Sequence, residues 1–478
     1  MLLMLLTVNA LAAEELTLQD ALQEALAGNL ELQQAGMTLQ QAQSAVQQSR
    51  GAFDPTVSVS TTTRASSSPS NNTLDNVSVV NTSAVDVSAG LSQRLPTGGS
   101  VQLSWSESVS TSNAESQVSD SFYNDSAWLV VSQPLLSGAW LAARASVRGA
   151  MLSLGQQELR YRLSVEQLVL MVSEAYWELL AARERLRLAE ESERNAEQQF
   201  NNVQERFEEG FAGTYEVLQF QRSLGVARQV TVIGRASARA AENRLSRLLG
   251  RPLQDAAAIQ LVDRPQLIQG VADVQVSLAH ARKGNSAWLI EQLSAEQAEL
   301  NHSAARINTL PDLSVSSQLG LSGGATDQAS SRQQLTDQTN PLWSLSGNFQ
   351  VAIPARTARA TRSQAGLSAE QARLALVAAE QDLIASVDRA VQFLERDQLR
   401  NQLSQQTLEA AQLSVDAEQE RYREGKATAQ QVVIAVEALN EAQSSMLEAE
   451  IDLQASQLSL LQLEGRLLSS LGITPPEW

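Results

Sequence analysis

The chain has 478 residues, no cysteine and a formal net charge of −18. The missing cysteines exclude disulfides, thiolate metal sites, cysteine nucleophiles and a lipid-modified cysteine within this sequence, and the negative charge without a cluster of Lys and Arg argues against nucleic acid as a partner. Aromatic residues make up only 4%, which favours long helices in thin layers over one thick core.

Residues 1–12 have the composition of an export signal: an apolar stretch followed by small residues. The positively charged residues that usually precede such a stretch are missing, so we expect this segment to be truncated at its start. The competing interpretation is a frayed apolar helix. Elsewhere no run approaches the ~18–20 apolar residues of a spanning helix, so any membrane crossing would need strands.

A first unit of helix and strands follows, and we assign residues 13–250 to it as repeat 1. Thr17, with Asp20 three residues on, predicts the start of a helix over 18–50. Alternating Ser/Thr and apolar residues, together with a tight turn around Gly98, then predict four strands within about 55–133. Their expected ranges are 55–65, 78–95, 99–109 and 124–133.

A long helix over about 142–208 comes next, without Pro and with a heptad seam from Leu168 to Phe207. At 1.5 Å per residue it would be ~100 Å long. The helix should end at a tip around Gly210, and a second helix should return over about 214–249. A linker over 251–271 carries two prolines and closes this half.

The second half, residues 272–478, repeats the first and is assigned as repeat 2. The segment 204–210, Gln-Glu-Arg-Phe-Glu-Glu-Gly, recurs at 419–425 as Gln-Glu-Arg-Tyr-Arg-Glu-Gly. Matches upstream of both segments share one spacing, which indicates an internal duplication. The expected elements are a helix over 272–308, strands over 312–322 and 343–353, a long helix over 357–423, a tip at Gly425 and a helix over 428–471.

Six strands are too few to close a barrel, because the smallest barrels have eight. Three copies contributing four to six strands each would give about 12–18 strands and a water-filled lumen. We expect six per chain; the alternative is four, with the hairpin around Gly98 folded elsewhere. Five aromatic residues near strand ends would form interfacial girdles: Trp105, Phe122, Tyr123, Trp128 and Trp343.

The sequence resembles the TolC-like outer membrane factors of bacterial efflux and type I secretion. The resemblance rests on Leu16-Thr17-Leu18 with Ala21-Leu22 and Ala25-Leu26, Gly28-Asn29, Pro55, Ser132-Gln133-Pro134-Leu135 and the two tips. It implies an α+β membrane protein built from two repeats, in which a trimeric transmembrane β-barrel continues into a long periplasmic α-helical coiled-coil barrel. It also implies a location in the bacterial outer membrane, with a large periplasmic part. The absence of cysteine predicts that the protein is not a lipoprotein.

The resemblance further implies partners and functional residues, but no catalytic residue, cofactor or metal. A homotrimer would meet a periplasmic adaptor protein, and the adaptor would couple it to an inner-membrane efflux or ABC transporter. The adaptor would contact the tips at Gly210, Thr214, Gly425 and Ala429. The entrance gate would comprise Glu216, Tyr422, Lys426, Gln431 and Ile434.

This gate departs from the family pattern. Relatives pair an acidic residue of the first tip with an Arg of the second, where this chain has Ala427. Glu216 could pair instead with the neighbouring Lys426, or both could be solvated charges. The positions of two acidic rings carry Gln431 and Ile434, so we expect a less acidic constriction.

The favoured function is a passive outer-membrane exit duct of a tripartite efflux pump or a type I secretion system. One alternative is a trimeric coiled-coil scaffold, which explains the heptads but not the two strand blocks. Another is a passive porin of the cell envelope, for which the long helices have no evident use. An enzyme is not supported, because no nucleophile, base and orienting group occur together. The sequence does not identify the cargo.

Overall fold

The computed structural model describes residues 14–117, 119–137, 139–251, 259–264, 273–424 and 426–474. These residues divide into two compact units. One lies within residues 1–40, 157–290 and 377–478, and the other comprises 41–156 and 291–376. The predicted signal over 1–12 and most of the predicted linker lie outside the described residues, so the signal and the repeat boundaries stay predictions.

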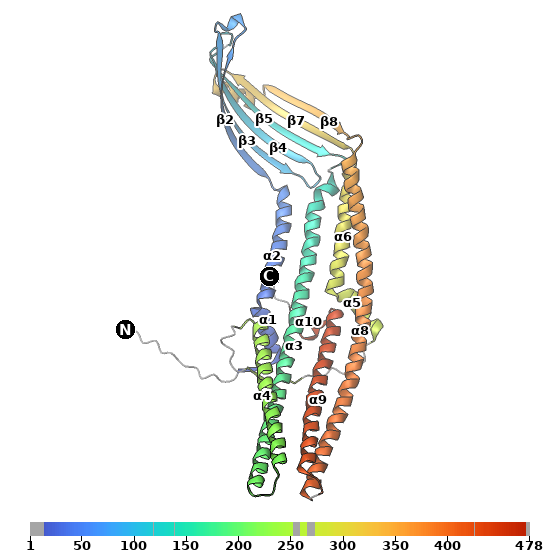
Figure 1. Ribbon diagram of the computed structural model, residues 1–478. Helices are drawn as coiled ribbons and strands as arrows, with labels where there is room; N and C mark the ends of the chain where they lie inside the picture. Colours follow the sequence, from blue (N-terminus) through green and yellow to red (C-terminus); the bar gives the residue numbers. More distant parts are fainter. Residues whose placement is uncertain are drawn as a thin grey trace, which may run out of the picture. The chain divides into compact units, whose positions relative to one another are not determined.

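The second unit contains one antiparallel sheet of six strands (Figure 1), in the order β2-β3-β4-β5-β7-β8. The hairpin around Gly98 therefore belongs to the same sheet as the other strands, in agreement with six strands per chain. The last strand begins and ends three residues earlier than the predicted range of 343–353. It therefore ends before Pro354, which was expected to close it. The bounds are β2 (Thr56–Pro69), β3 (Val79–Arg94), β4 (Ser100–Ser112), β5 (Ser121–Pro134), β7 (Asp312–Ala325) and β8 (Asn340–Gln350).

Between the strands predicted over 312–322 and 343–353, the polar segment near 323–340 was expected to form a loop, but it contains helix α7 (Gln328–Thr336). The carboxylate of Asp327 caps this helix by accepting a hydrogen bond from the Ser330 amide at 2.9 Å. The prediction was wrong because Ser and Gln dominate the segment and give no helical pattern of apolar residues. Two short 3₁₀ turns, Gly51–Phe53 and Thr73–Asp75, flank β2.

Two very long helices, α3 (Trp140–Glu208) and α8 (Arg356–Arg423), contribute residues to both units. The heptad seam of α3 is buried from Leu168 to Ala182 and again at Ala189 and Val203, whereas Leu186 is half-buried and Phe207 is 40% exposed. The seam thus predicts packing along most of the helix but not at its end. Among the described residues, no helix combines the length and the apolar character required to cross a membrane.

The two shorter helix segments were each predicted as one continuous helix, and each is interrupted after a glycine. The first is divided into α1 (Leu18–Gly28) and α2 (Leu30–Arg50), and the second into α5 (Val274–Gly284) and α6 (Ser286–Ile307). Thr17 caps α1 as predicted, by accepting from the Asp20 amide. At both breaks an Asn with an extended backbone follows the glycine.

Each Asn bridges the break to a third helix. Asn29 accepts from the Leu32 amide at 3.0 Å and donates to the Leu248 carbonyl at 3.1 Å, at the end of α4 (Thr214–Leu248). Asn285 accepts from the Trp288 amide at 2.9 Å and donates to the Leu463 carbonyl at 3.1 Å, at the end of α9 (Ala429–Leu463). We call these arrangements the first and second junctions.

Close backbone approaches complete the junctions. A Cβ on Gly28 would lie 2.6 Å from the Leu249 carbonyl oxygen, and a Cβ on Gly284 would lie 2.7 Å from that of Glu464. Gly250 and Gly465 have φ values of +77° and +68° and face Gly28 and Gly284 in turn. The helix predicted to reach residue 471 therefore ends at Leu463, and α10 (Leu467–Ser470) follows separately.

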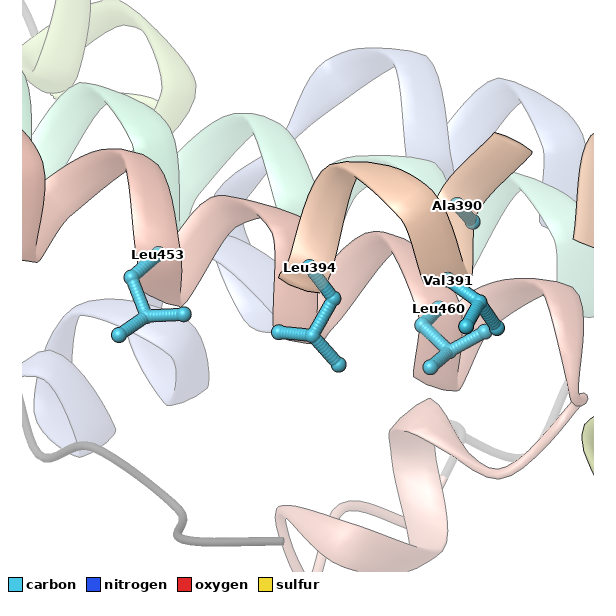
Figure 2. Packing of buried hydrophobic residues seen from close by; sticks show 5 residues of the cluster. All are labelled: Ala390, Val391, Leu394, Leu453 and Leu460. Atoms are coloured by element: carbon cyan, nitrogen blue, oxygen red, sulfur yellow. The ribbon is translucent and has the colours of Figure 1, made fainter. Parts of the chain in front are cut away.

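The core of the first unit lies between the paired helices. Figure 2 shows one cluster, in which side chains of α8 pack beside Leu453 and Leu460 of α9; the α8 residues are Ala390, Val391 and Leu394. The first unit also contains a parallel pair that sequence analysis missed, β1 (Glu14–Leu16) with β6 (Ile259–Leu261). Tyr176, buried in α3, donates from its hydroxyl to the Leu16 carbonyl at 2.9 Å.

Candidate functional site

The six-stranded sheet has one apolar face. Residues directly paired in an antiparallel sheet point to the same side, so the register defines rows across the strands. One row is apolar in all six strands, and every member is at least 37% exposed: Val57, Leu91, Leu103, Leu129, Leu319 and Trp343. We call the side of the sheet that carries this row the apolar face.

The opposite side, the serine face, is polar. One of its rows reads Ser60, Ser88, Ser106, Ser126 and Ser322. Within this row the hydroxyls of Ser60 and Ser88 are 2.7 Å apart and those of Ser106 and Ser126 are 2.8 Å apart. Four charged residues of the described strands lie on this face, Arg64, Asp86, Arg94 and Asp312, and the first two form an ion pair at 2.6 Å.

The predicted aromatic girdle is divided between the two faces. Trp105 and Tyr123 share the apolar face with Trp343, whereas Phe122 and Trp128 lie on the serine face. The five residues therefore cannot form one set of lipid-facing girdles, because alternate residues of a strand point to opposite sides. The girdle stays a prediction for the three on the apolar face.

Two carboxylates on the apolar face are covered by α7. Glu107 pairs with Arg332 of α7 at 2.6 Å and is directly opposite Asp125 in the register. Asp125 is only 1% exposed, and neither of its carboxylate oxygens has a hydrogen-bond partner among the described residues. The helix thus shields charges that would otherwise interrupt the apolar face.

The edges of the sheet are unpaired within the chain. β2 and β8 are the two edge strands, and they run in opposite directions because five successive pairings are antiparallel. An exposed edge with free amide and carbonyl groups can pair with another chain. The geometry therefore allows β8 of one copy to pair antiparallel with β2 of the next.

The first tip closes α3 through a left-handed glycine. Gly210 has φ +83°, and the Phe211 amide donates to the Arg206 carbonyl at 2.7 Å, a Schellman-type ending. Thr214 is the first residue of α4, and both Thr214 and Glu216 are exposed to solvent.

The second tip has the same backbone closure: the Lys426 amide donates to the Arg421 carbonyl at 2.8 Å. The Lys426 ammonium pairs with Glu424 at 2.7 Å, and no pair between Lys426 and Glu216 occurs within the described part of the chain. The residues that the structure describes do not include Gly425 or the side chains of Tyr422 and Ala429.

The two ring positions behave differently from each other. The Gln431 side chain accepts from the Thr428 amide at 2.7 Å and so caps α9, whereas Ile434 is 55% exposed. Gln431 thus has a structural role that the sequence comparison did not indicate. The assignment of all five residues to a gate stays a prediction.

A groove of about 560 Å³ lies between α3, α4 and α9 in the part of these helices nearest the tips. Its lining mixes apolar and polar side chains, including Ala196, Asn202, Val230 and Asn440, and it contains one carboxylate, Glu437. Sequence analysis did not find it, because a groove between helices from two repeats requires their packing.

A chain of ion pairs links α3, α9 and α8 farther along. Arg185 pairs with Glu448 at 2.6 Å, Glu448 lies 4.0 Å from Arg400, and Arg400 also pairs with Asp452. Nearby Asp397 is 1% exposed. Burial alone would raise the pKa of Asp397, but hydrogen bonds from Arg396 and Ser456 hold it below its ordinary value. No group of three or more His, Asp or Glu residues suited to a metal occurs where the structure is described.

The chain belongs to the outer membrane efflux protein family, whose sequence profile matches residues 100–251 and 278–466. This match confirms the resemblance to outer membrane factors. Its two segments fall in the two halves identified as repeats.

Two curated relatives come from Pseudomonas aeruginosa. The pyoverdine export outer membrane protein OpmQ is 29% identical over 343 residues, covering 70% of this chain and 66% of OpmQ. The alkaline protease secretion protein AprF is 28% identical over 239 residues, covering 49% of this chain and 48% of AprF. The matches thus span less than two thirds of the length of these relatives.

The fold is also that of solved outer-membrane channels. The CmeC outer membrane channel of Campylobacter jejuni aligns with a TM-score of 0.68 at 16% identity, covering 96% of this chain and 87% of CmeC. This similarity confirms the predicted fold class, in which a strand region is combined with long helices.

Proposed function

We propose that three copies of this chain form a passive exit duct through the bacterial outer membrane, serving efflux or secretion. The observation that carries the proposal is the sheet. It exposes an apolar row on one face and serines on the other, and it has two unpaired edges of opposite direction. Lipid would cover the apolar face, and the serine face would line water.

Three copies would supply about 18 strands, enough for an aqueous lumen. The unpaired edges support this closure, because free amide and carbonyl groups are costly in lipid. The family match and the export and secretion roles named for OpmQ and AprF support a transport function. The long helices α3 and α8 would continue the duct into the periplasm.

The partners in this proposal are a periplasmic adaptor and an inner-membrane transporter that supplies energy. The adaptor would contact the tips at Gly210, Thr214, Gly425 and Ala429, next to the groove between α3, α4 and α9. The mixed lining of this groove suits a helix of a partner protein. The gate residues Glu216, Tyr422, Lys426, Gln431 and Ile434 would narrow the periplasmic entrance.

The test is disulfide formation between the two edge strands. Since the chain has no cysteine, every disulfide must come from introduced pairs. Several positions are combined, because the pairing of residues between β2 and β8 of neighbouring copies can take more than one register. One cysteine is placed in β2, by Ser58→Cys, Ser60→Cys or Thr62→Cys. The other is placed in β8, by Ser344→Cys, Ser346→Cys or Asn348→Cys. At least one pair should give covalent dimers and trimers, and nothing larger, on non-reducing gels of outer-membrane fractions.

A matched control places both cysteines on interior strands that are not neighbours, such as Ser88→Cys in β3 with Ser126→Cys in β5. This pair should form no crosslinked species. Monomers for all nine edge combinations, or ladders that extend beyond three copies, would contradict a closed ring of three.

A further inference from the structure

Trp128 occupies an unusual position on the serine face. Among the aromatic residues of the described strands, only Phe122 and Trp128 lie on this side. Phe122 is at the beginning of β5, whereas Trp128 is in its middle. An indole in the middle of a hydroxyl-rich wall has no role in contact with lipid, so its position requires another explanation.

The Trp128 ring lies over the neighbouring strand. Its direct partner in β7 is Gly320, and a Cβ on Gly320 would lie 2.5 Å from two atoms of the six-membered ring, Cε3 and Cζ3. The ring thus fills the space that a side chain at Gly320 would take. Trp128 is half-buried, so one side of the indole rests on the wall and part of it stays open.

Uncharged residues surround the indole. Two of them are apolar, Val130 in β5 and Leu342, the partner of Gly320 in β8, and most of the others are small or can form hydrogen bonds. In the row of Trp128, Ser104 of β4 lies on the side away from Gly320. Gly90 of β3 lies beyond Ser104 in the same row. Gln102 and Ser106 of β4 and Gln318 and Ser322 of β7 lie two residues above and below these partners. Side chains at such diagonal positions are about 7–8 Å apart, within reach of one small ligand ring. The two glycines leave room beside the indole.

We propose that Trp128 is a binding platform for a ring of an uncharged oligosaccharide passing through the duct. The inference rests on the proposed function, since it requires the serine face to line water. A sugar ring has an apolar side of C–H groups and a rim of hydroxyls. The electron-rich indole face attracts the C–H groups, and the Ser and Gln side chains can exchange hydrogen bonds with the rim.

The surroundings select this class of ligand. An ionised ligand finds no counter-charge among the neighbours named above, because none of them is charged. A purely aromatic ligand would stack on the indole but would leave the surrounding donors and acceptors without partners. A sugar ring uses both, as small-ligand sites usually combine an apolar surface with a few well-placed polar groups.

The experiment measures current through the purified full-length protein in planar bilayers, with maltohexaose as the probe. Maltohexaose should reduce the current in a saturable manner. Trp128→Ala should weaken its binding at least fivefold, and Trp128→Phe should weaken it less. The matched control is Trp105→Ala, a tryptophan of the adjacent strand on the apolar face, which should leave binding within twofold of the original chain.

The outcomes separate the two proposals. Current without saturable sugar block, or equal block in the original chain and Trp128→Ala, would overturn the platform and leave the duct intact. A chain that inserts into the bilayer but passes no current would overturn both. If Trp128→Ala does not assemble, Trp128→Phe and Gly320→Ala serve in its place; unchanged block in both variants would likewise overturn the platform.

Discussion

The first and second junctions share their backbone arrangement but differ in the charges around it. In both, a glycine ends one helix, an Asn begins the next, and the Asn amide reaches the last turn of a third helix. At the first junction Arg251 pairs with Glu24 at 2.5 Å, and Glu24 is one-third exposed. At the second, Glu166 is 1% exposed and pairs with Arg162, which also donates to the Gly465 carbonyl.

The comparison shows which features the duplication has preserved. The two close glycine approaches, the Asn bonds and an Arg directly after the left-handed glycine recur at equivalent positions, whereas the acidic partner of that Arg does not. Arg251 pairs with Glu24, and Arg466 pairs with Glu464. Backbone groups that meet directly leave no room for a side chain, and a buried Asn must satisfy several hydrogen bonds at once. A charged residue on a surface has many alternatives. The junctions therefore constrain glycine and Asn most strongly.

Alanine at the left-handed glycines should have the largest effect. In Gly250→Ala and Gly465→Ala the new Cβ would overlap the carbonyl group of Gly28 or Gly284. The left-handed backbone adds about 1–2 kcal/mol, and the overlap adds about 1–3 kcal/mol. We expect a large fall in the thermal midpoint of the helical circular dichroism signal for both variants.

Gly210→Ala provides the matched control, because Gly210 has φ +83° but no atom within 4 Å of its Cβ position. It should show only the smaller cost of the left-handed backbone. Equal losses at all three positions would mean that the backbone approaches at the junctions contribute nothing beyond conformational strain.

Removing the Asn side chains should have the next largest effect. Asn29→Ala and Asn285→Ala each lose a helix cap and a bond to a carbonyl, for a cost of about 1–3 kcal/mol. The two losses should be similar if the junctions are equivalent. Asn29→Ser and Asn285→Ser keep a neutral capping oxygen but are too short to reach the carbonyl, so their losses should be smaller in chemical or thermal unfolding. A loss confined to one junction would contradict the equivalence.

The smallest effect concerns pH and should distinguish the second junction. Burial raises the pKa of Glu166 above 4.5, and the charge of Arg162 opposes the shift only in part. The folded chain therefore favours the neutral carboxyl. The neutral Glu166 carboxyl makes its full contribution to folding stability below pH 4.5. This contribution is lost as the pH rises through the folded-state pKa of Glu166.

Glu166→Gln should flatten this part of the pH dependence of the thermal midpoint, because glutamine keeps the acceptor for Arg162 without a charge. Arg162→Gln should make it steeper, since the opposing charge is removed. Identical pH profiles for both variants and the original chain would exclude Glu166 as the source.

Much of the fold could be predicted because its patterns are local. The seam of α3 predicts its buried positions, and alternation places the strands. The breaks after Gly28 and Gly284 were missed, because an isolated glycine is often tolerated within a helix. The repeated Gly-Asn pair was a visible signal for them. The pairing of β1 with β6 joins segments about 245 residues apart and has no local pattern.

The face occupied by Trp128 could not be predicted for a different reason. Residues 128–131, Trp-Leu-Val-Val, are all apolar, so no alternation indicates which of them point toward lipid. A shift of one residue exchanges the two faces. Only the register with Gly320, whose missing side chain accommodates the indole, places Trp128 on the serine face.

The even number of strands in the sheet limits how many strands each copy can gain or lose while the proposed barrel stays antiparallel. Each copy begins and ends with strands of opposite direction, so neighbouring copies can pair antiparallel in a ring of any number of copies. The number of copies in the ring must therefore be set by the curvature of the sheet or by the helices. A single added strand would force a parallel seam between every two neighbouring copies, whatever their number. Growth or loss is therefore possible only by whole hairpins, and the pair β3–β4 is a unit of that size.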